Sequence, residues 1–301
     1  MALLNLKGLG VALVTPFNKD LSIDFNSLGR IIDHIIDGGA DYIVVLGTTA
    51  ETPTLNLEER ILITDFVRQK VEGKIPLVIG IGGNCTKRVC DEISNRDLTG
   101  YSAILSVTPY YNKPTQEGLY QHFKNICEAS PLPIVLYNVP GRTGVNLTAK
   151  TTLRLSQFEN IIGVKEASGN LDQINEIIKN APDNFKVISG NDSDTISIIK
   201  SGGQGVISVV ANALPAFMKD LVMYCQKRQW GKAEELQLNI SKLISHIFEE
   251  GNPAGIKALL SKLGFCENIV RLPLVPVSET VEHKLQEELS KIKIVRNILN
   301  D

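Results

Sequence analysis

Short apolar runs rich in β-branched residues alternate with longer segments of helical periodicity along residues 10–210. Because strands buried on both faces are almost continuously hydrophobic, these runs indicate the strands of a parallel sheet. Eight repeats of strand then helix, joined by right-handed crossovers, close most simply into a (β/α)8 TIM barrel. The expected strands are 10–15, 42–46, 77–80, 103–107, 134–137, 161–165, 186–189 and 205–210.

The helices expected between these strands often begin with Asn, Asp, Thr or Pro, which are typical helix starts. An open, doubly wound sheet would show the same alternation. Against it, no Gly-x-Gly-x-x-Gly turn follows the first strand, where a dinucleotide-binding half would place it. Helix candidates between the strands include 25–36, 57–71, 116–129, 171–180 and 194–200.

The strand pattern stops after residue 210, and the chain from about residue 214 to 301 is expected to be helical throughout. Only the first helix of this stretch can complete the barrel. We therefore expect a barrel domain, residues 1–228, and a C-terminal helical subdomain, residues 229–301. Helices in this stretch are predicted over 232–250, 253–263 and 278–292.

Composition and charge exclude several classes of protein. The 301 residues are 43% hydrophobic, and 31 Lys and Arg against 33 Asp and Glu give a net charge of −2, so a nucleic-acid or membrane-surface partner is not expected. No run reaches the roughly 18 apolar residues of a membrane span. The chain start lacks a secretory signal, and the five cysteines lack zinc or dithiol spacing, so we expect reduced thiols and a cytoplasmic protein.

Lys165 ends the apolar run 161–164. Burial at the end of such a strand penalises the charged ammonium and favours the neutral amine, which is a nucleophile for a carbonyl carbon. The alternative is a side chain that lies past the strand and extends to water while its stem covers apolar surface. Because barrel enzymes carry their chemistry at the carboxyl ends of the strands, the remaining candidates should follow the other strands.

Hydroxyls and phenols follow two of those strands. Thr48 and Thr49 form a tight turn after the second strand, where they could hold a carboxylate or pass a proton. The alternative is that they cap the start of a helix. Tyr110 and Tyr111 follow the fourth strand between two prolines, and exposed tyrosine pairs are more often packing or subunit-contact residues than catalysts.

Tyr137 ends the fifth strand, and Arg142 follows it on a Pro-Gly turn. The planar guanidinium of arginine matches a carboxylate with two parallel hydrogen bonds, so Arg142 is a candidate for binding an acidic substrate. A solvated loop arginine is the alternative. The four histidines fall in expected helices without metal-ligand spacing, so they are expected to be structural or surface residues.

Together these strand ends place an amine, phenols, hydroxyls and an arginine on one rim, without a metal or nucleotide motif. This combination predicts Schiff-base chemistry on a 2-oxo acid, in which the amine forms an iminium that withdraws electrons from the neighbouring carbon. A phenol can transfer the protons. The alternative is a barrel without catalytic activity that binds a small acid or serves as a scaffold, because fold alone does not fix function.

The chain resembles the dihydrodipicolinate synthase family of pyruvate-dependent class I aldolases, which also contains N-acetylneuraminate lyase. The resemblance extends from residues 10–16 to residues 271–276. It is most specific over 109–123, 137–144 and 162–167. It implies a TIM barrel, no cofactor and no metal, and a homotetramer built as a dimer of dimers.

The resemblance also implies the roles of individual residues. Lys165 would form the Schiff base with pyruvate, and Tyr137 would be the general acid and base. Thr48 and Tyr111 would complete a proton relay with Tyr137, with Tyr111 supplied by a neighbouring subunit.

The remaining implied roles concern substrate carboxylates. Thr49 and the backbone at Ile207 would bind the carboxylate of pyruvate, and Arg142 that of L-aspartate 4-semialdehyde. The implied activity is the condensation of these two substrates, the first committed step of diaminopimelate and lysine biosynthesis. The alternative within the family is a lyase for N-acetylneuraminate or a 2-keto-3-deoxy sugar acid, and the intact Pro-Gly-Arg-Thr-Gly turn favours the semialdehyde.

Two departures from the family pattern affect these expectations. Ala50 replaces a glycine after the two threonines, and an alanine would be strained if that position needs a positive φ. Leu57, Arg60 and Arg88 stand at positions where many relatives bind the inhibitor lysine, although Asn84 and Tyr110 are retained. Because added arginines repel a cationic amino acid, we expect weak or absent inhibition by lysine.

Overall fold

The computed structural model describes residues 6–292. Its strands form one closed barrel in chain order, and neighbouring strands from β2 to β8 pair in parallel. The predicted (β/α)8 TIM barrel is therefore confirmed. The strands are β1 (Gly8–Ala12), β2 (Tyr42–Val45), β3 (Leu77–Gly80), β4 (Ala103–Val107), β5 (Ile134–Asn138), β6 (Ile161–Glu166), β7 (Lys186–Ser189) and β8 (Gly205–Ser208).

The strand positions match the sequence pattern, but some ends differ. β1 lies a few residues earlier than predicted, and β8 ends at Ser208 because the chain then turns into the 3-10 helix η4 (Val210–Asn212). β5 and β6 each continue one residue further than predicted, to Asn138 and Glu166. The two added residues are buried and polar, and they follow the candidate catalytic residues Tyr137 and Lys165.

Glycines allow β1 and β8 to approach each other closely. A Cβ atom added at Gly205 would collide with the backbone of Gly8. Gly8 N–H donates to the carbonyl of Gln204 at 2.9 Å. An alanine at Gly205 would therefore push these strands apart, whereas one at Gly8 would collide with the side chain of Asp41.

The structure divides into two compact units. The first comprises residues 6–10, 41–45 and 75–207 and holds β2 to β7 with most of β1 and β8. The second comprises residues 11–40, 46–74 and 208–292. The division into residues 1–228 and 229–301 that the sequence suggests stays a prediction.

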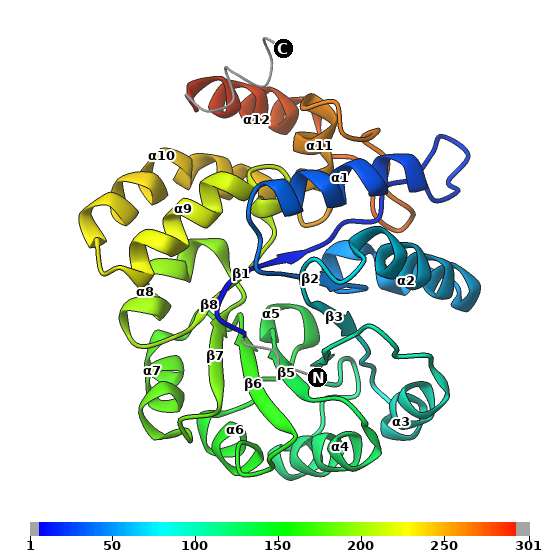
Figure 1. The fold of residues 1–301 in the computed structure, drawn as a ribbon, viewed down its shortest axis with the longest axis vertical. Helices are drawn as coiled ribbons and strands as arrows, with labels where there is room; N and C mark the ends of the chain where they lie inside the picture. Colours follow the sequence, from blue (N-terminus) through cyan, green and yellow to red (C-terminus); the bar gives the residue numbers. More distant parts are fainter. Residues whose placement is uncertain (1–5, 293–301) are drawn as a thin grey trace. The chain divides into compact units, whose positions relative to one another are not determined.

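Apart from the short α5, the helices of the first unit lie in chain order outside its strands (Figure 1). Helix α3 packs on α4, α4 on α6, α6 on α7, and α7 on α8. Helices α4 and α7 have the predicted bounds, whereas α8 begins one residue later than predicted. The helices are α3 (Thr86–Asn95), α4 (Gln116–Ala129), α5 (Pro140–Thr143), α6 (Ala149–Leu155), α7 (Leu171–Asn180) and α8 (Thr195–Lys200).

The second unit holds the remaining helices. Helix α10 packs on α9, α11 and α12, and α1 packs on α2 and α9. The expectation of helix throughout residues 214–301 is wrong for residues 263–278, which contain no helix, and residues 293–301 lie outside the described part. The helices are α1 (Phe25–Asp37), α2 (Leu57–Val71), α9 (Pro215–Gln226), α10 (Trp230–Glu249), α11 (Ala254–Lys262) and α12 (Glu279–Lys291).

Local sequence explains where several of these helices begin. Asp24 accepts a hydrogen bond from Ser27 N–H at the start of α1, and α1 buries the apolar face formed by Leu28, Ile31 and Ile35. The segment Asn56-Leu-Glu-Glu59 forms a capping box at the start of α2. Within residues 6–292, none of the helices has the length and apolar character needed to cross a membrane.

Candidate active site

Lys165 and Tyr137 lie side by side near the carboxyl ends of neighbouring strands. β5 and β6 run in parallel, with Tyr137 in register with Lys165. Only 5% of Lys165 and 7% of Tyr137 is exposed, and Lys165 Nζ lies 4.4 Å from the centre of the Tyr137 ring. The alternative in which Lys165 extends to water is therefore wrong.

This arrangement suits the formation of an imine. The Lys165 amine is a nucleophile for a carbonyl carbon. The hydroxyl of the neighbouring Tyr137 is a phenol, which can donate and accept a proton. In the part of the chain that the structure describes, no group of three or more His, Cys, Asp or Glu side chains is arranged to hold a metal ion. The chemistry available from these residues is covalent and acid–base chemistry.

The next residue on each strand belongs to a second, fully buried pair. Asn138 is in register with Glu166, and neither is exposed. Because side chains alternate across a strand, this pair points to the opposite side of the sheet from Tyr137 and Lys165. Asn138 Nδ2 donates to Glu166 Oε1 at 2.7 Å. Sequence reasoning missed Glu166, although the strand alternation next to Lys165 could have located it.

Arg142 lies on a short helical turn directly after β5. In α5, Arg142 N–H donates to the carbonyl of Val139 at 2.9 Å, and Gly144 N–H donates to that of Pro140 at 2.9 Å. Gly144 has a φ of 71°, a conformation that suits glycine. The buried Thr143 hydroxyl donates to the carbonyl of Val145 at 2.9 Å. The turn thus holds the exposed Arg142 five residues beyond Tyr137.

Ile207 and Tyr111 occupy other strand ends of the first unit. Ile207 lies in β8 and is 1% exposed. Tyr111 lies in the loop after β4, has a φ of 73°, and is 89% exposed. A large aromatic side chain held at a positive φ on the surface is unusual for an isolated chain.

Thr48 and Thr49 lie in the second unit, in the 3-10 helix η1 (Thr48–Ala50) after β2. Thr49 is 2% exposed, and its hydroxyl accepts a hydrogen bond from Asn252 Nδ2 at 3.0 Å. The concern over strain at Ala50 does not hold, because the left-handed residue is Glu51, with a φ of 55°. The alanine therefore fits this turn without a backbone penalty.

Glu51 fixes the end of this turn through a buried ion pair with Lys257 of α11. Neither side chain is exposed, and Lys257 also donates to the carbonyl of Ile269 at 2.8 Å. Burial lowers the pKa of Lys257, and the neighbouring Glu51 carboxylate opposes that shift. Glu51 Oε2 accepts a hydrogen bond from Arg271 N–H at 2.9 Å.

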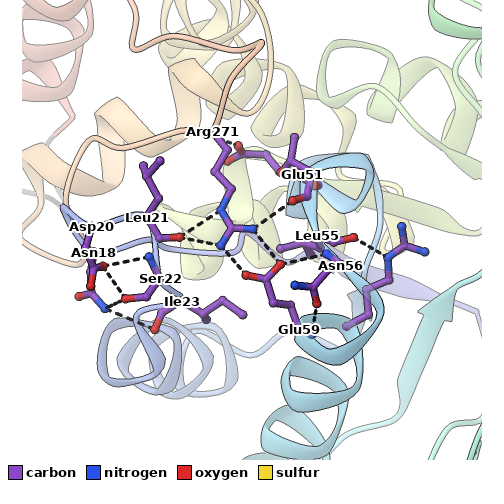
Figure 2. A network of polar contacts seen from close by, with 12 residues as sticks. Asn18, Asp20, Leu21, Ser22, Ile23, Glu51, Leu55, Asn56, Glu59 and Arg271 are labelled. Atoms are coloured by element: carbon purple, nitrogen blue, oxygen red, sulfur yellow. Dashed lines mark hydrogen bonds and ion pairs between the residues drawn. The ribbon is translucent and has the colours of Figure 1, made fainter.

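The guanidinium of Arg271 connects the same region to the start of α2. Figure 2 shows Arg271 between Glu51, Glu59 and the carbonyl of Leu21. Arg271 contacts Glu59 at 2.5 and 2.9 Å, and Glu59 also caps α2 through Asn56. Sequence reasoning missed Glu51, Lys257 and Arg271, since partners about 200 residues apart leave no local spacing signal.

The predicted site residues are thus placed in two groups. The structure brings Lys165 and Tyr137 together. Arg142 lies in α5, which directly follows β5, the strand that carries Tyr137. Tyr111 and Ile207 belong to other strands or loops of the same unit. Thr48 and Thr49 belong to the second unit.

Comparison with known proteins gives a consistent result. Residues 5–292 match the Dihydrodipicolinate synthetase family. The 4-hydroxy-tetrahydrodipicolinate synthase of Parabacteroides distasonis is 51% identical over 295 residues, covering 98% of this chain and 99% of that protein.

Two solved structures extend the similarity to the fold. A monomeric dihydrodipicolinate synthase variant is 41% identical with a TM-score of 0.92, covering 95% of this chain and 96% of that chain. The chloride-inhibited dihydrodipicolinate synthase of Acinetobacter baumannii, complexed with pyruvate, is 37% identical with a TM-score of 0.92, covering 95% and 99%. On its sequence and its fold, this chain belongs to the dihydrodipicolinate synthetase family.

Proposed function

We propose that this chain is a 4-hydroxy-tetrahydrodipicolinate synthase, a lyase of diaminopimelate and lysine biosynthesis that condenses pyruvate with L-aspartate 4-semialdehyde. The observation that carries the proposal is the buried Lys165 amine beside Tyr137 at the ends of two paired strands. Relatives named for this activity match nearly the whole chain, and one solved relative is complexed with pyruvate.

In the proposed reaction, the Lys165 amine attacks the ketone carbon of pyruvate, and loss of water gives an imine. Loss of a proton from the methyl group gives an enamine, whose carbon attacks the aldehyde of the semialdehyde. The amino group of the second substrate then displaces Lys165 and closes the ring. Two substrates thus become one cyclic product and one water, and Lys165 is regenerated.

The other site residues have supporting roles in this proposal. Tyr137 carries protons to and from the imine, with Thr48 and Tyr111 as relay partners. Thr49 and the backbone at Ile207 hold the carboxylate of pyruvate. Arg142 holds the carboxylate of the semialdehyde, because its exposed guanidinium can donate two parallel hydrogen bonds.

Borohydride trapping tests the covalent step directly. With pyruvate present, borohydride should reduce the imine to a stable amine, and mass spectrometry should find one adduct per chain on the peptide that contains Lys165. Lactate is the matched control, because it has a carboxylate but no ketone. A chain that gains no mass with pyruvate would favour the alternative of a binding or scaffold barrel.

Replacing Arg142 by leucine should raise the KM for aspartate semialdehyde by roughly ten- to a hundredfold, the range expected for losing hydrogen bonds to a charged group. Trapping of pyruvate on Lys165 should not change, because Arg142 acts on the second substrate. Steady-state kinetics with each substrate varied in turn measures this.

The control for Arg142 is Arg154→Leu, which removes an exposed arginine that pairs with Glu117 on the helix surface. Its KM for the semialdehyde should match that of the unsubstituted protein. Faster turnover of N-acetylneuraminate or 2-keto-3-deoxygluconate by the unsubstituted protein would instead assign the chain to the sugar-acid lyases.

Assembly and location complete the proposal. We expect a homotetramer made of two dimers, with the Tyr111 loop at the tighter contact. The positive backbone φ and the exposed side chain of Tyr111 support such a contact, whereas one solved relative is a monomeric variant. The cytoplasmic location and the weak inhibition by lysine stay predictions.

A further inference from the structure

We propose that Glu166, as a carboxylate, is a positioning residue that closes the base of the Arg142 loop, residues 139–147, and so sets the affinity for the second substrate. The proposal rests on the function proposed above for Lys165 and Arg142. It concerns residues on the side of the sheet opposite Tyr137 and Lys165, which contact no reacting atom in the proposed mechanism.

The carboxylate of Glu166 is surrounded by hydrogen-bond donors. Oε1 accepts from Asn138 Nδ2 at 2.7 Å and from Gln173 Nε2 at 3.1 Å. Oε2 accepts from the backbone N–H of Ser168 at 3.2 Å and from its hydroxyl at 2.6 Å. Because the NH2 groups of Asn138 and Gln173 and the backbone N–H of Ser168 can only donate, these donors fit a group that accepts on both oxygens.

Burial of the Glu166 carboxylate costs free energy that an apolar residue at this position would not. Glu166 is 0% exposed, and a buried carboxylate is expensive even when it is hydrogen-bonded. Burial raises the pKa of Glu166, and the hydrogen bonds from Ser168, Asn138 and Gln173 oppose this shift. An apolar pair in place of Asn138 and Glu166 would pack β5 against β6 at a lower cost in free energy. We therefore ascribe the carboxylate to the place in which it holds its two acceptor oxygens.

The same amides hold the return end of the Arg142 loop. Asn138 Oδ1 accepts from the backbone N–H of Leu147 at 2.9 Å, and Asn138 Nδ2 donates to Asn146 Oδ1 at 2.8 Å. Gln173 Nε2 donates to the carbonyl of Leu147 at 3.2 Å, and Asn146 Nδ2 donates to Gln173 Oε1 at 2.8 Å.

Asn138 and Leu147 thus join the start and the end of the loop, with Arg142 between them. Glu166 fixes the orientation of both amides, because Oε1 can accept only from their NH2 groups. It also follows Lys165 on β6. One carboxylate therefore ties the strand of the amine to the loop that carries the carboxylate-binding arginine.

The test is Glu166→Gln, which keeps the shape but replaces one acceptor oxygen by a donor. The new NH2 group must face either Asn138 and Gln173 or Ser168, so at least one buried donor loses its acceptor. We expect the KM for aspartate semialdehyde to rise about tenfold, the size expected for one such loss. The kcat and the trapping of pyruvate on Lys165 should change little.

Two further variants separate positioning from general damage. Ser168→Ala removes a single hydroxyl donor and should shift the KM in the same direction by a smaller factor. Glu159→Gln, an exposed carboxylate just before β6, is the control without an effect.

Hydrogen exchange at the Leu147 amide gives a readout that needs no substrate. In Glu166→Gln, this amide should exchange faster, whereas exchange at β4 should remain as in the unsubstituted protein. Unchanged exchange at Leu147, or equal losses of kcat and of pyruvate trapping, would overturn the positioning role. If the unsubstituted protein fails to trap pyruvate, the proposed function is wrong, and the exchange experiment still decides the role of Glu166 in the loop.

Discussion

Lys165→Met should abolish the synthase activity, with kcat lower by roughly four to six orders of magnitude, the range seen when a catalytic nucleophile is removed. Methionine keeps an apolar stem of similar length but cannot form an imine. Among residues 6–292, Lys165 and Lys257 are the buried lysines, and Lys257 is held by Glu51. A second buried amine is therefore not free to replace it.

Two measurements check this result. A turnover assay with both substrates gives the rate, and borohydride trapping should find no pyruvate adduct on the variant. The matched control is Lys186→Met, because Lys186 begins β7, the neighbouring strand, and donates to the carbonyl of Asp183 at 2.7 Å. Retained activity in Lys165→Met, or a lost adduct in Lys186→Met, would contradict the assignment of the nucleophile.

Lys257→Met should lower the free energy of unfolding by about 3–5 kcal/mol, the usual cost of breaking a buried ion pair from one side. The substitution leaves the buried Glu51 carboxylate without its cationic partner, although it still accepts a hydrogen bond from the backbone N–H of Arg271. Because Glu51 ends the turn that carries Thr48 and Thr49, activity should fall as well. Urea denaturation followed by circular dichroism measures the shift.

The control for Lys257 lies on the same helix. Lys262 pairs with Glu282 at 2.9 Å, but both side chains are about one third exposed. Lys262→Met should therefore cost at most about 1 kcal/mol. The double variant Glu51→Gln/Lys257→Met should recover part of the lost stability, because it removes the uncompensated charge. Equal stabilities of Lys257→Met and Lys262→Met would show that the buried pair contributes little.

The barrel could be predicted from the sequence because its signals are local. Apolar runs located all eight strands, and α2, α4 and α7 have the expected bounds. The ends of β1 and β8 were less predictable, since Val209 and Val210 are β-branched but the chain turns there into η4. Residues 263–278 form no helix, and Pro273 and Pro276 in this segment are local signals against a helix that the general expectation overlooked.

The candidate site shows the same division between local and distant signals. Lys165, Tyr137 and Arg142 stand next to strand ends, so their spacing from the strands pointed to them. Glu51 and Lys257 are paired across 206 residues, and only the folded chain reveals such a pair. The concern over Ala50 came from the family pattern, and the backbone resolves it by placing the positive φ at Glu51.

The closure of residues 139–147 by Asn138 and Gln173 has a consequence for protein engineering. Side chains of β5 and α7 fasten the return end of this segment at Leu147, and its start continues directly from β5, so its middle can be rewritten without disturbing these anchor points. The corresponding segment of a sugar-acid lyase could be grafted between the same anchor points. Such an exchange would change which aldehyde the enzyme accepts and leave the residues that react with pyruvate unaltered.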